Sequence, residues 1–155
     1  MVRLNLNDIE FEYDDSDPEG FRSGRVKVAR GTPKRTGTSV WELPPGEAMC
    51  PYHYEIGEEE WLLVLDGRPT LRTPEGKREL APEELVFFPT GPGGAHEVRN
   101  ETDETVRALM WSEVVFPTAT VYPDSDKIGI WTDAEKSDDV IVRRSSGVDY
   151  FEGET

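Results

Sequence analysis

The two histidines of this 155-residue chain, His53 and His96, each lie in a short segment whose residue types could hold a metal ion. Carboxylates follow the first histidine at Glu55 and Glu60, and the glycine-rich segment 91–94 precedes the second. Neutral imidazole is the commonest metal ligand in proteins, and carboxylate oxygens complete many such sites. Because the chain has only two histidines and both have such neighbours, we expect one shared metal site.

The alternation of residues around these positions indicates how their side chains could converge. In an extended strand, residues i and i+2 point to the same face, so His53 and Glu55 would project together. Glu60 begins a strongly apolar segment and would share a face with Leu62 and Val64. If that face points into the core, a carboxylate on it is costly unless it is paired or bound to a metal. This parity favours Glu60 as the ligand over Glu59, and a solvated surface charge is the alternative.

Short strand patterns separated by turn residues recur along most of the chain. They occupy the segments 25–30, 39–43, 61–65, 70–72, 85–88, 96–99 and 105–112. No long segment has the periodicity of an amphipathic helix. Several short strands at such spacing predict an all-β sandwich or barrel.

The length of the chain suits one domain with a substantial core, and we expect a single domain over residues 1–155. Its core barrel would span about 25–115, between an acidic, irregular N-terminal arm at 1–24 and a C-terminal extension at 116–155.

The C-terminal extension carries further, weaker patterns. We expect 128–131 to dock on the body and 139–144 to form a late strand. Two aromatic residues lie in the tail 147–151, and we expect them to pack back on the domain or on a second subunit.

The composition excludes several classes of function. The chain has 32 acidic and 17 basic residues and a net charge of −15, which repels phosphate backbones and anionic lipid. Neither nucleic-acid nor membrane binding is therefore expected, and no apolar run approaches the roughly 20 residues that span a bilayer. Cys50 is the single cysteine, and the first ten residues lack a signal-peptide pattern, so we expect a cytoplasmic protein.

Two segments resemble the two sequence motifs of the cupin superfamily. The matching residues are Gly46, His53, Glu60 and Gly67 in the first segment, and Pro89, Gly91, His96 and Asn100 in the second. The order and separation of the two motifs are those of the family, although the spacer between Gly91 and His96 is longer than usual. The resemblance implies a small single-domain cupin with a double-stranded β-helix, or jelly-roll, barrel.

One departure from the family pattern concerns the metal ligands. The resemblance implies three histidines and one glutamate, but Glu55 stands where the second histidine of the first motif is expected. The candidate ligands of one divalent ion (Mn, Fe, Zn or Ni) are therefore His53, Glu55, Glu60 and His96. Cys50 is a weaker candidate, since a lone cysteine is more often a small buried apolar residue.

Three interpretations of Glu55 are open. As a fourth ligand it makes a harder, more anionic set that favours Mn²⁺ or Fe²⁺ over Cu²⁺. As a non-ligand it leaves His53, His96 and Glu60 as a triad of two histidines and one carboxylate with open coordination positions. Swung out to solvent, it would mark a site that has lost its metal.

The resemblance implies a function only in outline, because cupins host many chemistries on one barrel. The leading hypothesis is a metal-dependent enzyme of the dioxygenase, isomerase or epimerase, or decarboxylase type, acting on a small polar metabolite. The metal would act as a Lewis acid, and a non-ligating Glu55 could serve as general base. The alternative is a non-catalytic module that binds or senses a small molecule, with or without metal. Cupins often pair through edge strands and exchanged termini, so we also expect a homodimer.

Overall fold

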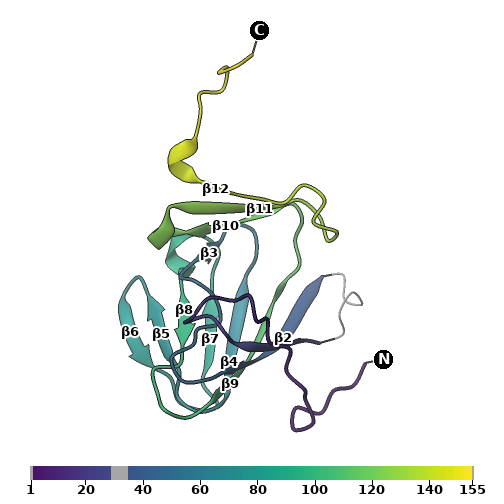
Figure 1. The fold of residues 1–155 in the computed structure, drawn as a ribbon, viewed down its shortest axis with the longest axis vertical. Coiled ribbons are helices and arrows are strands. Elements are labelled where there is room, and N and C mark those ends of the chain that lie inside the picture. Colours follow the sequence, from purple (N-terminus) through teal and green to yellow (C-terminus); the bar gives the residue numbers. More distant parts are fainter. Residues whose placement is uncertain (1, 29–34, 155) are drawn as a thin grey trace.

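The alternating segments of the sequence become strands in the computed structural model, which describes residues 2–28 and 35–154 (Figure 1). The strands of the described residues are β1 (Gly24–Lys27), β2 (Thr36–Leu43), β3 (Tyr54–Glu55), β4 (Glu60–Asp66), β5 (Thr70–Thr73), β6 (Gly76–Glu79), β7 (Leu85–Phe88), β8 (Glu97–Arg99), β9 (Val106–Glu113), β10 (Thr118–Tyr122), β11 (Lys127–Trp131) and β12 (Val140–Arg143). Three single-turn 3₁₀ helices join them, namely η1 (Pro92–Gly94), η2 (Pro123–Ser125) and η3 (Arg144–Ser146). The prediction of an all-β chain is confirmed. Among the described residues, none of the helices has the length and apolar character that a membrane crossing requires.

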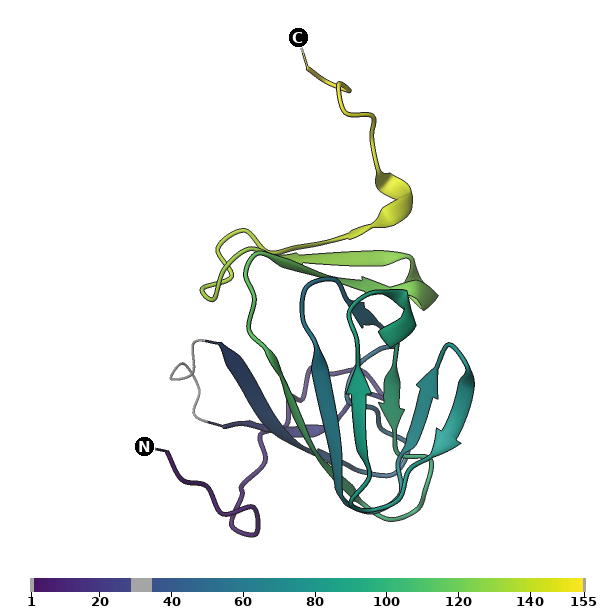
Figure 2. The ribbon, with the colours of Figure 1, turned by 180° about the vertical axis from the view of Figure 1, so that it is seen from behind.

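The strands form three antiparallel sheets that together build the barrel. One sheet has the order β1-β2-β9-β4-β7 and a second has the order β6-β5-β8. The third sheet, β12-β11-β10-β3, lies across one end of the other two, at the top in Figures 1 and 2. Because β3 belongs to this third sheet, the C-terminal strands lie next to the segment that follows His53.

The core lies between the first two sheets and consists of residues that alternate along their strands. Leu62 and Val64 of β4, Leu71 of β5, Val98 of β8 and Val106 of β9 all belong to it and are fully buried. Each such aliphatic side chain contributes about 1.5 to 3 kcal/mol when it is removed from water. Glu60 is the first residue of β4, and it lies on the same inward face of the strand as Leu62 and Val64.

Most strand predictions agree with the structure within the usual uncertainty of strand ends. The segments predicted at 39–43, 61–65, 70–72, 85–88, 96–99 and 105–112 correspond to β2, β4, β5, β7, β8 and β9. The segment predicted at 25–30 corresponds to β1, and its residues 29 and 30 lie outside the described residues. The late strand predicted at 139–144 is confirmed as β12, and the segment 128–131, which was expected to dock on the body, lies in β11 and pairs with β10.

β6 and β10 were missed by the sequence interpretation, and the short strand β3 was not among the predicted segments. All four residues of β6 are exposed and three are charged, so it carries no apolar signal, and only its pairing with β5 makes it a strand. β10 has the sequence Thr-Ala-Thr-Val-Tyr, in which hydroxyl-bearing residues alternate with apolar ones. That alternation is a strand signal, and the proline at each end of the segment hid it.

One face of the third sheet is apolar. Its cross-strand rows contain Tyr54, Val121, Ile128 and Val142, and then Ala119, Ile130 and Val140. Beyond η3 the tail runs away from the body in both views (Figures 1 and 2). Tyr150 is 89% exposed and Phe151 is 76% exposed, so the expectation that they pack back on their own domain is wrong. Packing on a second subunit stays a prediction.

Candidate metal centre

The backbone holds His53 and His96 directly opposite each other. The two residues form an isolated antiparallel bridge just before β3 and β8. The amide of His53 donates to the carbonyl of His96 at 3.1 Å, and the amide of His96 donates back at 2.8 Å. Both side chains are buried, and their ring centroids lie 4.6 Å apart. The structure therefore brings the two histidines together at one place, as the sequence motifs predict.

Backbone carbonyls determine which ring nitrogen of each histidine is available. Nδ1 of His53 lies 2.8 Å from the carbonyl oxygen of Pro51, and Nδ1 of His96 lies 2.9 Å from that of Gly94. A carbonyl only accepts, so each Nδ1 carries the proton and donates it. Nε2 of each ring is then left with a lone pair, which is the form that binds a metal. The ring of Phe88 stacks on His96 with centroids 3.7 Å apart and holds it in place.

The glycine-rich loop before His96 explains how this histidine returns to the barrel. Gly91 has a φ of +79°, a conformation that favours glycine. A Cβ on Gly94 would lie only 1.7 Å from the carbonyl oxygen of Pro89. The backbone at Gly94 can therefore pack this closely against Pro89 only because glycine has no side chain. The same tight turn presents the Gly94 carbonyl to Nδ1 of His96.

Glu60 lies at the start of β4 and points its carboxylate at both histidines. Its Oε2 atom lies 3.6 Å from Nε2 of His96 and 3.9 Å from Nε2 of His53. Among the residues that the structure describes, these three form a group whose donor atoms all lie within 4.8 Å of one another. Metal–ligand bonds of about 2.1 Å place neighbouring donor atoms about 3.0 to 3.5 Å apart, close to the observed separations.

The electrostatics of this group favour a cation. Oε2 of Glu60 and Nε2 of His96 are buried and have no hydrogen-bond partner. Both are acceptors, and a divalent ion would satisfy both at once, whereas buried polar groups are normally paired. Burial raises the pKa of Glu60 to about 7 and lowers the pKa of His96 to about 3, because each charged form loses its hydration. His53, Glu60 and His96 therefore fit a divalent metal ion.

Glu55 faces the same space but is held by a different partner. Its carboxylate oxygens accept hydrogen bonds from the Thr120 hydroxyl at 2.8 and 2.9 Å. Its Oε1 atom lies 3.7 Å from Nε2 of His53, and its side chain is only 12% exposed. The interpretation in which Glu55 swings out to solvent is therefore wrong. Glu55 stands outside the converging group of three, an arrangement like that of the triad with a non-ligating carboxylate.

Cys50 and the hydroxyl-bearing residues of β10 complete the surroundings. Cys50 does not belong to the converging group, and burial raises the pKa of its thiol. Tyr122 lies with its ring 6.0 Å from that of His53, and burial raises the pKa of its phenol to about 12, so the phenol keeps its proton. Sequence reasoning missed Thr120 and Tyr122 because it missed β10, whose i, i+2 alternation places both on one face.

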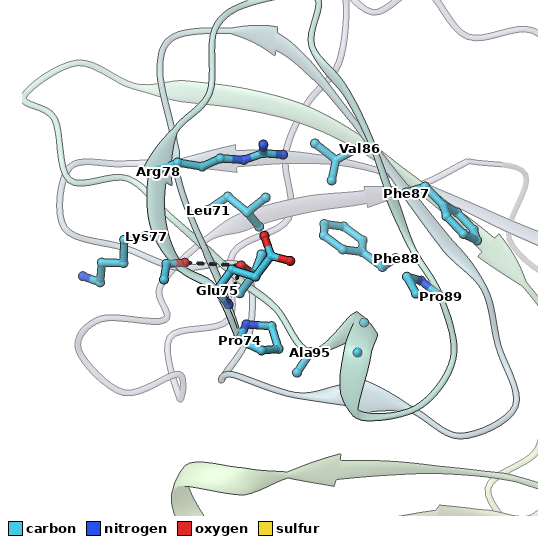
Figure 3. A pocket seen from close by; sticks show the side chains of 14 residues that line it. Leu71, Pro74, Glu75, Lys77, Arg78, Val86, Phe87, Phe88, Pro89 and Ala95 are labelled. Atoms are coloured by element: carbon cyan, nitrogen blue, oxygen red, sulfur yellow. Dashed lines mark hydrogen bonds between the residues drawn. The ribbon is translucent and has the colours of Figure 1, made fainter.

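A separate groove of about 430 Å³ lies between the β5–β6 hairpin and β7 (Figure 3). Its apolar side includes Leu71, Val86 and Phe88, and the hairpin adds Lys77 and Arg78. None of the four candidate metal residues lines this groove. Phe88 lines the groove and stacks on His96, and Gly94 and Ala95, which directly precede His96, line it as well.

Comparisons with known proteins agree with this geometry. Residues 39–112 match a protein-family model described as a cupin domain. A solved sugar phosphate isomerase of the cupin superfamily from Silicibacter pomeroyi has a TM-score of 0.80 at 20% identity, covering 94% of each chain. A protein from Acidithiobacillus ferrooxidans, also named for sugar phosphate isomerase, has a TM-score of 0.78 at 22% identity, covering 93% of this chain and 91% of its own.

A more distant similarity covers less of the chain. A polyketide cyclase from Streptomyces resistomycificus has a TM-score of 0.59 at 22% identity, covering 73% of this chain and 79% of its own. The comparison with curated proteins gives no match. At these identities the solved structures establish the fold, and the family model adds a match to the cupin domain over residues 39–112. Residues 39–112 are therefore similar to a cupin domain, and the chain has the jelly-roll fold of these solved structures.

Proposed function

We propose that the protein is a metal-dependent isomerase of a small hydroxylated carbonyl compound, such as a sugar or a sugar phosphate. The observation that carries the proposal is that two carboxylates near the histidines are held in different positions. Glu60 converges with the two histidines, while Glu55 lies 3.7 Å from His53 but is held outside that group by Thr120. An isomerisation of this type uses both a Lewis acid and a separate proton acceptor.

The names of two structural neighbours support this choice among the reactions open to the fold. The proteins from Silicibacter pomeroyi and Acidithiobacillus ferrooxidans are both named for sugar phosphate isomerase. Their likeness covers more than nine tenths of this chain, so it includes most of the C-terminal extension that carries Thr120. The likeness is one of fold, and the argument for this chain rests on the arrangement of Glu55 and Glu60.

The residues of this chain have distinct roles in the proposed reaction. A divalent ion held by His53, Glu60 and His96 would polarise the carbonyl and the adjacent hydroxyl group of the substrate. Glu55 takes the proton from the carbon that bears the hydroxyl group and returns it to the former carbonyl carbon. The hydroxyl proton moves to the carbonyl oxygen, so substrate and product are isomers and no oxidant is consumed. Tyr122 keeps its phenol proton and can donate a hydrogen bond to a substrate oxygen.

Proton exchange with solvent tests this proposal directly. The metal-loaded protein is incubated in D₂O with a panel of aldoses, ketoses and their phosphates, and NMR follows deuterium at the carbon next to the carbonyl. We expect isomer formation with deuterium uptake for at least one compound, loss of both on chelation, and recovery on adding Mn²⁺ or Fe²⁺. Glu55→Gln should abolish exchange and keep its metal, whereas the exposed neighbour control Glu59→Gln should behave as the wild type.

One outcome would replace the proposal with the binding-module alternative. In that case the protein binds metal, and a member of the panel raises its thermal stability, but no compound is isomerised or exchanges its proton. A ligand that binds only the native state raises the unfolding temperature by mass action without any turnover.

A further inference from the structure

We propose that Thr120 and Trp131 act as positioning residues that hold the Glu55 carboxylate beside the metal centre and out of the ligand set. Both lie in the C-terminal extension, beyond residues 39–112 that match the cupin model. The inference rests on the proposed function only where it takes Glu55 to act on a substrate. Its central claim concerns where this carboxylate is held, which can be measured without any substrate.

The strand register places three of the participating residues in one row across the third sheet. Glu55 of β3 is the direct partner of Thr120 of β10, and Thr120 is the direct partner of Gly129 of β11. Directly opposed residues in antiparallel strands point to the same face, with Cβ atoms about 4.5 to 5.5 Å apart. Trp131 lies two residues after Gly129 and therefore shares this face. The register alone thus brings Trp131, Thr120 and Glu55 to one side of the sheet.

Gly129 allows the indole of Trp131 to reach Thr120. A Cβ built on Gly129 would lie 2.6 Å from Cζ2 of Trp131, closer than real Cβ contacts. The indole therefore lies across β11 in space that any other residue at position 129 would occupy. In this position its Nε1 atom donates a hydrogen bond to the Thr120 hydroxyl at 2.7 Å.

The direction of this hydrogen bond determines what the Thr120 hydroxyl does. An indole N–H can only donate, so Thr120 accepts from Trp131 with an oxygen lone pair. Its single proton is then directed to Glu55, whose two oxygens lie 2.8 and 2.9 Å away. Thr120 is only 4% exposed, so water does not compete for this proton. A hydrogen bond to an ionised carboxylate in such surroundings is about twice as strong as one between neutral groups.

The hydrogen bonds from Trp131 to Thr120 and from Thr120 to Glu55, together called the tether, have a consequence for metal binding. Glu55 lies 3.7 Å from Nε2 of His53, close enough for its carboxylate to turn toward the ion if nothing restrained it. Removing the Thr120 hydroxyl would free Glu55 to become a fourth ligand. Coordination would then compete with proton abstraction from the substrate, so metal affinity should rise while turnover falls.

Mn²⁺ binding to the full chain without substrate, measured by calorimetry and by the EPR spectrum of the ion, tests the inference. We expect Thr120→Val to bind Mn²⁺ about tenfold more tightly than the wild type, the change that loss of one charged hydrogen bond predicts. Thr120→Ser keeps the hydroxyl and should restore the wild-type affinity. Thr118→Val is the matched control, because Thr118 is buried on the same face of β10 and its hydroxyl has no partner.

Further variants separate the tether from a general effect on folding. Trp131→Phe and Gly129→Ala leave the Thr120 hydroxyl in place but remove the hydrogen bond from the indole that directs its proton to Glu55. Each should therefore tighten Mn²⁺ binding, but by less than Thr120→Val does. Adding Glu55→Gln to Thr120→Val should cancel the gain, because the carboxylate that would coordinate the ion is gone. These variants keep the test decisive if Thr120→Val does not fold.

The outcomes distinguish this inference from the proposed function. Equal Mn²⁺ affinities and EPR spectra for Thr120→Val and Thr118→Val would overturn it even if the protein proves to be an isomerase. Tighter binding that Glu55→Gln cancels would support it even if no isomerisation is found. A wild type that takes up no Mn²⁺ would overturn both the inference and the metal centre.

Discussion

Replacing Glu60 with glutamine is expected to stabilise the metal-free protein and to abolish its stabilisation by metal. Burial raises the pKa of Glu60 from 4.5 to about 7, and the side chain is only 16% exposed, so solvent screens this effect little. At about 1.4 kcal/mol per pKa unit, keeping this carboxylate ionised in the native state costs about 3 kcal/mol. The glutamine amide also lacks partners there, which costs about 1 kcal/mol. The net gain for Glu60→Gln above pH 7 is therefore about 2 kcal/mol.

The pH dependence of this gain follows from the direction of the shift. Because the pKa is raised, Glu60 in the native protein still holds its proton at pH values where Glu60 in the unfolded chain has already released it. Between pH 4.5 and about 7 the stability of the wild type therefore falls as the pH rises, and above pH 7 the full cost is present. Below pH 4.5 the carboxyl is neutral in both states, so the advantage of Glu60→Gln disappears.

Urea unfolding with a chelator at pH 8 and pH 5, and again with Mn²⁺ at pH 8, measures this effect. For a chain of this length, 2 kcal/mol corresponds to a rise of about 4 to 8 °C in the unfolding temperature. Glu59→Gln is the matched control, since Glu59 is the exposed neighbour of Glu60 in the same run of glutamates. The reasoning is refuted if Glu60→Gln is no more stable than Glu59→Gln at pH 8 with chelator, or if Mn²⁺ still stabilises it.

Three further predictions concern metal binding, the fold and the assembly. The affinity for Mn²⁺, measured by calorimetry, should improve about tenfold per pH unit as the pH rises to about 7 and then level off, because the ion must displace the proton of Glu60. Asn100→Ala should lower the free energy of unfolding in urea by about 3 kcal/mol and leave Mn²⁺ affinity unchanged, because the buried amide donates to the carbonyls of Leu43 at 2.8 Å and Glu104 at 2.7 Å. The chain should be a homodimer by light scattering, paired through the apolar face of the third sheet, and the double variant Ile130→Glu/Val142→Glu should be a monomer.

Each of these predictions has an outcome that contradicts it. A Mn²⁺ affinity that is flat between pH 5.5 and 7 would mean that Glu60 is not a ligand; His96 cannot blur the result, since burial lowers its pKa to about 3. An Asn100→Ala protein that stays stable but loses metal would place Asn100 at the site instead of in the fold. A monomeric wild type, or a double variant that stays dimeric, would contradict the proposed interface.

The size of the apolar face supports the expected dimer. Four strands about 4.8 Å apart, of two, five, five and four residues, offer a flat face of about 250 Å². The exposed aromatic side chains Tyr150 and Phe151 add about 150 to 250 Å² each if the tail reaches the partner. Stable interfaces bury about 800 Å² per partner, so the face and the tail together approach that size.

The metal centre shows which residues of a site can be predicted from patterns among neighbouring residues in the chain. His53, Glu60 and His96 were identified from their types, their turn glycines and the parity of Glu60 with Leu62 and Val64. Each of these signals is local, because strand alternation and turn chemistry depend on residues a few positions apart. The structure brings these three residues together as the pattern predicts.

The role of Glu55 could not be predicted in the same way. The sequence left three interpretations open, and the decisive neighbour is Thr120, which is 65 residues away in the chain. Thr120 meets Glu55 only because β10 pairs with β3, and β10 was not recognised as a strand. Pairing between distant strands depends on the packing of the whole sheet, which no local pattern records.

The sequence by itself determined the all-β class, most of the strands and the residues that could hold a metal. Those features arise from alternation, from turn residues and from the chemistry of individual side chains, which the order of residues shows directly. Only the tertiary structure decided which carboxylate joins the histidines and which is held aside, because that choice depends on one hydroxyl and one indole of a distant sheet. The two histidines mark the site, and the strand register of the C-terminal extension decides how Glu55 is used there.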